Sequence, residues 1–271
     1  MVADSRPFIY TNRMDLAGKK AVITGGGRGI GRAVARALAE AGASVLVASR
    51  TTPEVEAVAA ELAEAGLDAH FARLDVTDAK SVQALAATAK DKLGQVDILV
   101  NNAGIATSAP VKTQSLEGWN RVMAVNATGT FLCTQAFVVE MAARGWGRVV
   151  NIASIASRMG APYISAYTAS KHAVLGFTRA AAAEMASKGV TVNAVCPGYV
   201  DTEMTIESVE RVMKQTKLSR EDALAAILRT ASQSRLITPS EVAFVVASLC
   251  DDKAGGINGQ AVVIDGGGLL A

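Results

Sequence analysis

The chain has 271 residues, half of them hydrophobic and 19% charged, so it can bury a sizeable core. Its 27 basic and 25 acidic residues give a formal net charge of +2, which provides no broad basic field for nucleic acid. No apolar run approaches the roughly 18 residues that span a bilayer, and the N-terminus has no apolar region of the signal-peptide type.

The cysteines and histidines give no sign of a metal centre or a disulfide. Cys133, Cys196 and Cys250 are widely spaced and odd in number, which favours free thiols in a reducing compartment. His70 and His172 have no further ligand at metal spacing. We therefore expect a cytoplasmic protein without a metal, and without nucleic acid or membrane as a partner.

The first part of the chain has the pattern of a phosphate-binding unit. After a loose leader over residues 1–17, an apolar strand is expected at Lys20–Thr24 and a helix at Arg32–Ala41. Between them lies a glycine-rich turn, in which Gly25, Arg28, Gly29, Ile30 and Gly31 are the candidate contacts. Glycines let the backbone turn sharply and approach a pyrophosphate, and the helix N-terminus adds unpaired N–H groups. The alternative is a tight turn without a ligand.

The second strand, expected at Ser44–Ser49, indicates which dinucleotide is preferred. In such units this strand ends beside the adenosine ribose, where an acid binds the 2′-hydroxyl and an arginine accommodates a 2′-phosphate. Here Ser49 is followed by Arg50, and Arg28 can reach the same phosphate. The sequence therefore predicts that NADP(H) is preferred over NAD(H). The alternative is that both arginines are solvated surface residues.

Strands and helices continue to alternate to the end of the chain. This pattern predicts an α/β fold with a single Rossmann-type, doubly wound parallel sheet of about seven strands and helices on both faces. No linker or repeat divides the chain, so we expect one domain over 1–271, with an insert at 202–238. Strands are expected at 69–74, 96–100, 147–152, 190–196 and 261–264, and helices at 53–65, 78–93, 115–144 (one long helix or two abutting ones), 165–187 and 239–249.

Tyr167 and Lys171 are four residues apart, which places them on one face of a helix. A nearby ammonium lowers the pKa of a tyrosine, which normally lies near 10. Ser154 follows the expected strand at 147–152, and its hydroxyl can hold a carbonyl or alcohol oxygen. The three side chains together form a candidate proton-transfer device for a C–O centre. Most Tyr-x-x-x-Lys pairs, however, are a helix face without chemistry.

These stretches together resemble the short-chain dehydrogenase/reductase family, in particular its 3-oxoacyl reductases, from about residue 16 to the end. The turn at 24–31 looks like the family's cofactor turn, and Ser154, thirteen residues before Tyr167, matches its catalytic spacing with Lys171. The other matching positions are Asp75 and Val76 near the adenine, Asn101, Asn102, Ala103 and Gly104 after the fourth strand, Asn126 in the long helix, and Pro197, Gly198, Val200 and Thr202 near the nicotinamide.

The resemblance implies hydride transfer between a nicotinamide and a carbonyl carbon. In the reduction, Tyr167 delivers the proton, Ser154 stabilises the oxygen, and Lys171 lowers the pKa of Tyr167 and holds the nicotinamide ribose. Asn126 is expected to hold a water that resupplies the proton. The resemblance also implies a homotetramer or homodimer, paired through the helices at 115–144 and 165–187 and through the last strand.

The insert at 202–238 is the expected substrate lid. It is amphipathic, and its apolar side can cover an acyl or ring substrate. Its basic side can meet the phosphates of a thioester carrier, or it can be a solvated face; it carries Arg211, Lys214, Lys217 and Arg220. A 3-oxoacyl thioester, a small cyclic ketone, a quinone and a sugar alcohol all stay open as substrates.

Two other classes of function were weighed against a reductase. A non-catalytic dinucleotide-binding regulator has no need to keep Asn126, Ser154, Tyr167 and Lys171 together. A nucleotide-sugar epimerase or dehydratase resembles longer relatives with a larger C-terminal substrate domain, whereas few residues follow Pro197 here.

Overall fold

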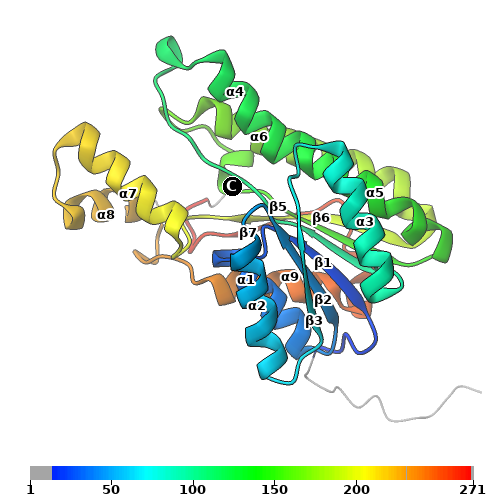
Figure 1. Cartoon of the computed structure of the whole chain (residues 1–271). Coiled ribbons are helices and arrows are strands. Elements are labelled where there is room, and N and C mark those ends of the chain that lie inside the picture. Colours follow the sequence, from blue (N-terminus) through cyan, green and yellow to red (C-terminus); the bar gives the residue numbers. More distant parts are fainter. Residues whose placement is uncertain (1–13, 230, 270–271) are drawn as a thin grey trace, which may run out of the picture.

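The computed structural model describes residues 14–229 and 231–269, which form one parallel β-sheet between two layers of helices (Figure 1). The strand order is β3-β2-β1-β4-β5-β6-β7, and every pairing is parallel. The predicted fold class is therefore confirmed. The strands are β1 (Lys20–Thr24), β2 (Ser44–Ser49), β3 (Ala69–Arg73), β4 (Ile98–Asn101), β5 (Gly147–Ile152), β6 (Val190–Pro197) and β7 (Ala261–Ile264).

Helices cover both faces of the sheet because its central strands are apolar on both sides. One layer contains α1, α2 and α9, and the other contains α3, α5 and α6 with α4 continuing α5 outward (Figure 1). The helices are α1 (Gly29–Glu40), α2 (Thr52–Glu64), α3 (Ala79–Leu93), α4 (Leu116–Met123), α5 (Gly129–Arg144), α6 (Ser165–Met185), α7 (Glu203–Thr216), α8 (Arg220–Leu228) and α9 (Pro239–Cys250).

The start of α1 differs from the sequence prediction. The helix begins at Gly29, not at Arg32, so Gly29 and Gly31 lie in its first turn. Glycine disfavours a helix interior, but in the first turn its lack of a side chain leaves the unpaired N–H groups open to a ligand. The glycine-rich turn and the helix N-terminus are thus one structural unit.

The long stretch between 115 and 144 is one continuous helix, as one of the two alternatives predicted, but it contains a π-helical turn. α4 and α5 are joined without a break by the π-helical turn Ala124–Thr128, which contains Asn126. Such a turn inserts an extra residue into the helix and often marks a functional position. Among the described residues, 116–144 is also the one helix long and apolar enough to cross a membrane, but 44% of its most apolar window is buried inside the protein. The core helix of a soluble protein passes the same test, so this is weak evidence for a membrane span.

The leader is shorter than expected. Leu16 is fully buried, and its amide donates to the carbonyl of Ala41 at 2.8 Å. Asp15 accepts a hydrogen bond from the amide of Ala17. Residues 14–17 therefore pack as part of the fold. The first thirteen residues of the predicted leader lie outside the described residues.

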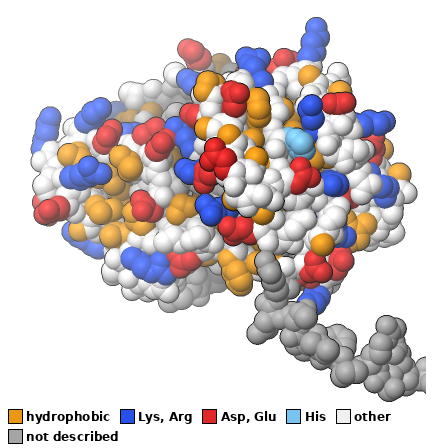
Figure 2. Space-filling view, turned by 60° about the horizontal axis from the view of Figure 1, so that its bottom comes forward, with side chains coloured by type: hydrophobic (Ala, Val, Ile, Leu, Met, Phe, Trp, Pro, Cys, Tyr) orange, Lys and Arg blue, Asp and Glu red, His pale blue; other side chains and the backbone are white. Residues whose placement is uncertain are grey.

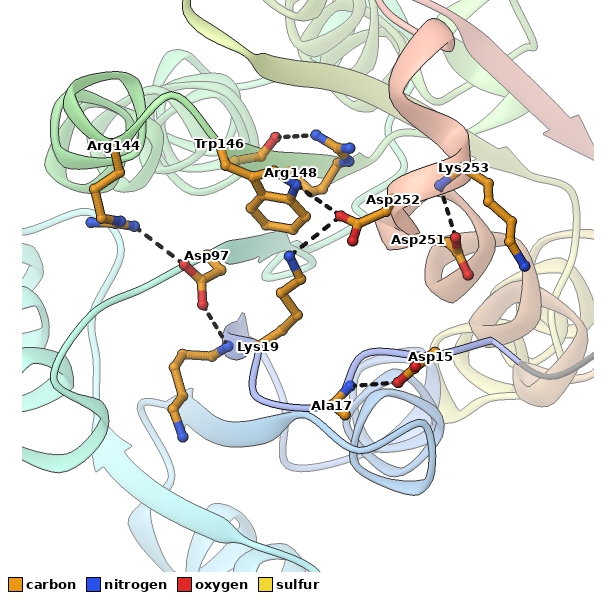
Figure 3. Close-up of polar contacts among 12 residues, drawn as sticks. Asp15, Ala17, Lys19, Asp97, Arg144, Trp146, Arg148, Asp251, Asp252 and Lys253 are labelled. Atoms are coloured by element: carbon orange, nitrogen blue, oxygen red, sulfur yellow. Dashed lines mark hydrogen bonds and ion pairs between the residues drawn. The ribbon is translucent and has the colours of Figure 1, made fainter. Parts of the chain in front are cut away.

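A polar cluster at the amino ends of the strands stabilises the end of the molecule away from the cavity described below (Figure 3). The Trp146 ring packs against two cations, with Lys19 Nζ 3.6 Å and Arg148 Cζ 4.5 Å from its centroid. Asp252 accepts hydrogen bonds from Trp146 Nε1 and Lys19 Nζ. Burial lowers the pKa of Arg148, and Asp251 and Asp252 oppose that effect. The cluster joins β1, β5 and the turn after α9, so we assign it a structural role.

Candidate active site

A cavity of about 610 Å³ lies at the carboxyl ends of the strands, where the strand order reverses between β1 and β4. Ligands of open α/β sheets bind at such switch points. The cavity brings together most residues that the sequence predicted as cofactor contacts: Gly25, Arg28, Gly29, Ile30, Ser49, Arg50, Asp75, Val76, Asn102, Ala103, Gly104 and Thr202. Six others do not line it: Gly31, Tyr167, Lys171, Pro197, Gly198 and Val200.

The glycines of the turn leave a cradle that other residues would fill. A Cβ on Gly31 would lie 2.2 Å from the carbonyl oxygen of Gly25, and one on Gly25 would lie 2.9 Å from Ala103 Cα. Asn102 fixes the turn, since its Nδ2 donates to the carbonyls of Thr24 and Gly25. Gly31 therefore acts through close packing, not through the cavity wall. The open turn and the α1 N-terminus suit the pyrophosphate of a dinucleotide.

The adenosine end of the cavity has a cation, Arg50, and an acid, Asp75, and the charge of Arg50 contributes to lowering the pKa of Asp75. Arg50 makes no hydrogen bond or ion pair within residues 14–229 and 231–269, and Ser49 Oγ donates to the carbonyl of Thr51. Asp75 accepts hydrogen bonds from the amide and hydroxyl of Thr77, which lower its pKa. No acid follows β2 directly, although Glu54, on the first turn of α2, also lines the cavity.

Arg28 has a different neighbour from the one expected. Its Nη1 forms an ion pair with Glu203 at the start of α7. One of the guanidinium's N–H donors is therefore already engaged, and only the others remain to bind a 2′-phosphate. Glu203 was not predicted as a site residue, because nothing in the sequence around it indicates a contact with a residue 175 positions away.

The candidate catalytic side chains lie next to one another where β5 meets α6. Ser154 follows β5, and its Oγ accepts from the amide of Ala156 and forms a hydrogen bond with the Tyr167 hydroxyl. Lys171 Nζ donates to the carbonyl of Ile152 at 2.7 Å and lies 5.7 Å from the centroid of the Tyr167 ring. Ser154 and Lys171 are both buried. The predicted juxtaposition of serine, tyrosine and lysine is thus present.

Burial dominates the electrostatics of this group. It raises the pKa of Tyr167 above its ordinary value, although the hydrogen bond with Ser154 acts in the opposite direction. It also lowers the pKa of Lys171 to about 8. Lys171 was expected to lower the pKa of Tyr167, but here desolvation outweighs any attraction between phenolate and ammonium. Tyr167 is therefore protonated at neutral pH, which suits a proton donor.

Asn126 connects the cavity wall to α6. Its Oδ1 accepts from the amide of Ile105, and its Nδ2 donates to the carbonyl of Ile105 and to Ser170 Oγ, each at 2.9 Å. Ser170 Oγ donates in turn to the carbonyl of Tyr167. The amide donors of Asn126 are used within the protein, so a water could meet this side chain only at the second lone pair of Oδ1.

Two further residues near these side chains were not assigned from the sequence. Tyr199, after β6, lies close enough to Tyr167 to contribute to its raised pKa. Arg121, on α4, lines the cavity, and its guanidinium makes no hydrogen bond or ion pair with any described residue. Arg121 is one helical turn before Val125, which also lines the cavity, so helical spacing was the available signal.

The insert forms a separate lobe beside the cavity, made by α7 and α8 (Figure 1). Val209 of α7 packs against Ala223 and Ile227 of α8 in a small cluster of its own. On the face shown in Figure 2, hydrophobic side chains on the lobe at the left are interspersed with charges of both signs. Met204 and Ile206, near the start of α7, are exposed.

A dinucleotide-sized cradle beside a buried serine, a half-buried tyrosine and a buried lysine defines an oxidoreductase that acts on C=O and CH–OH groups. A family model described as short chain dehydrogenase matches residues 19–212. The chain belongs to the short-chain dehydrogenase family.

Its relatives include several carbonyl reductases. A 3-oxoacyl-[acyl-carrier-protein] reductase from Synechocystis sp. is 39% identical over 257 residues, which cover 94% of this chain and 98% of the relative. A D-beta-hydroxybutyrate dehydrogenase from Rhizobium meliloti is 36% identical, with 92% and 98% covered. Among solved structures, an actinorhodin polyketide ketoreductase variant with NADPH has a TM-score of 0.89 and 38% identity, with 92% of this chain and 96% of that chain covered.

Proposed function

We propose that this protein is an NADPH-dependent reductase that converts a ketone into a secondary alcohol, with a 3-oxoacyl thioester as its substrate. The observation that supports this most directly is the position of the Tyr167 hydroxyl. It forms a hydrogen bond with Ser154, and Tyr167 is one turn of α6 before Lys171. The relatives that reduce 3-oxoacyl and polyketide carbonyls support the substrate class.

We assign each residue of the site a role in the reduction. The bound nicotinamide supplies the hydride to the carbonyl carbon. Ser154 holds the carbonyl oxygen, and Tyr167 donates its proton to that oxygen as negative charge develops. Lys171, with a pKa of about 8, stays largely charged at pH 7 and stabilises the phenolate left behind. Asn126 positions the Tyr167 turn through Ser170 and accepts a hydrogen bond from the water that returns the proton.

We assign the cofactor contacts from the residues that line the cavity and from those that follow β6. The turn at 25–31 holds the pyrophosphate, Arg50 and the remaining donors of Arg28 hold the 2′-phosphate, and Asp75 and Val76 border the adenine. Asn102, Ala103 and Gly104 form the floor. Pro197 at the end of β6, with Gly198, Val200 and Thr202 after it, borders the nicotinamide, and Thr202 of these lines the cavity itself.

Activity against a panel of ketones tests this proposal. NADPH oxidation is measured with 3-oxoacyl thioesters, cyclic ketones, quinones and keto sugars at equal concentrations. We expect the highest kcat/KM for a 3-oxoacyl thioester. A higher kcat/KM for a cyclic ketone, quinone or keto sugar would contradict the proposed substrate class and identify that compound class as the substrate instead. Cofactor binding without turnover of any ketone would favour the regulator.

We also propose that the protein acts in the cytoplasm as a homotetramer or homodimer. Phe131 and Val139 of α5 are exposed, and the Phe131 ring meets Phe177 of α6 edge-on with centroids 6.0 Å apart. Apolar side chains on two adjacent helices suit a helix-on-helix interface. Sedimentation velocity at micromolar concentration is expected to show a dimer or tetramer. A monomer alone would contradict this prediction.

A further inference from the structure

One ion pair joins the two walls of the cofactor cavity. Arg28 is the N-cap residue of α1 in the glycine-rich turn, and Glu203 is the first residue of α7 in the lobe. Both residues line the cavity, and they pair although 175 residues separate them in sequence. The pair therefore connects the phosphate-binding turn to the substrate lobe.

The segments that carry Arg28 and Glu203 also lie close to each other. A Cβ placed on Gly29 would lie 3.1 Å from Thr202 Cγ2, so the N-terminus of α7 packs directly on the turn. Gly29 begins α1, whose unpaired N–H groups are the proposed pyrophosphate site. The Arg28–Glu203 pair thus lies at the point where a bound pyrophosphate has the turn on one side and α7 on the other.

No other charged residue described around the cavity forms a second ion pair between the glycine-rich turn and α7. Glu207, one turn further along α7, pairs with Arg211 on its own helix. Arg50 and Arg121 line the cavity without ion pairs among the described residues, and Glu54 and Asp75 lie on other elements. Arg28 pairs through Nη1, which leaves its other donors for a phosphate.

We propose that Arg28 and Glu203 form a clasp that closes over the dinucleotide and must open for the cofactor to leave. This rests on the proposed dinucleotide binding, but it assigns Glu203 a role in cofactor retention. Because the clasp joins two protein walls, it slows the release of NADPH and NADH alike. Cofactor release is then coupled to the position of α7, which also borders the substrate.

The expected effect is moderate because both side chains are about 60% exposed. Exposed ion pairs are weak and are screened by salt, so loss of this one should speed release by about two- to fivefold. In the wild type, release should also become faster as the salt concentration rises.

The test is the dissociation rate of NADPH and of NADH, measured by stopped-flow fluorescence with an excess of competing cofactor. Glu203→Gln removes the charge and keeps the size, and Glu203→Asp keeps the charge. Glu210→Gln is the matched control, since Glu210 is exposed on the same helix and has no ion pair with a described residue. Circular dichroism checks that α7 remains folded.

We expect Glu203→Gln to release both cofactors faster, with Glu203→Asp and Glu210→Gln close to wild type. Unchanged release in Glu203→Gln would overturn the clasp and leave the proposed reductase intact. Slower release of NADPH alone would also overturn it, because Glu203 would then compete with the 2′-phosphate for Arg28. If the wild type bound neither cofactor, the proposed function would fail as well.

Discussion

Replacement of Tyr167 with phenylalanine is expected to reduce kcat by on the order of 10²–10⁴-fold, the range over which general acid catalysis contributes. The variant keeps the aromatic ring, so the packing around α6 is preserved, but it loses the hydroxyl that is bonded to Ser154. Hydride transfer would then leave an alkoxide without its proton donor. The melting temperature and the dissociation constant for NADPH should stay close to those of the wild type.

Steady-state kinetics with the best ketone of the panel measures this effect. Tyr163→Phe is the matched control, because Tyr163 lies just before α6 and its side chain is exposed. That variant should keep the wild-type kcat. If Tyr167→Phe kept more than about a tenth of the wild-type kcat, Tyr167 would not be the proton donor.

The second large effect concerns the choice of cofactor. The wild type is expected to prefer NADPH over NADH, because a 2′-phosphate needs cationic donors and is repelled by an acid. Arg50 lines the cavity without an ion pair among the described residues, and Ser49 stands at the end of β2, where an acid would bind the ribose hydroxyls. Two charge-assisted contacts of about 1.5–3 kcal/mol each amount to a preference of about 10²-fold or more.

The variant Ser49→Asp with Arg50→Ala should reverse that preference, because it adds repulsion of the 2′-phosphate and removes attraction. The measurement is kcat/KM for each cofactor in the wild type, the two single variants and the double variant. Each single variant should fall between the wild type and the double variant. Equal use of NADH and NADPH by the wild type would mean that Arg28 and Arg50 do not read the 2′-phosphate.

The sheet was predictable because its strands are nearly continuous apolar runs separated by helices. β1, β2, β5 and β7 begin and end as predicted, and β3, β4 and β6 differ by a residue or two at their ends. Two parts of the site were also predictable, namely the glycine-rich turn and the group of Ser154, Tyr167 and Lys171. Each depends on residues that are close in sequence or on a resemblance over the whole chain.

What could not be predicted depends on contacts between distant segments and on burial. Nothing near Arg28 in sequence indicates its pair with Glu203, and nothing near Leu16 indicates that this residue is fully buried. The net shift of the Tyr167 pKa could not be predicted, because spacing on a helix places Lys171 beside Tyr167 but does not show how deeply the two groups are buried. Desolvation raises the pKa of Tyr167 and lowers that of Lys171 at the same time.

The most direct test of the proposed function follows the hydride itself. NADPH deuterated at the nicotinamide C4 is incubated with a 3-oxoacyl thioester and the wild-type protein, and the product is analysed by mass spectrometry. A 3-hydroxyacyl thioester with one deuterium on the carbinol carbon, formed by the wild type and reduced in yield by Tyr167→Phe, is the expected result. A protein that binds NADPH yet forms no deuterated alcohol from any ketone of the panel would contradict the assignment as a reductase.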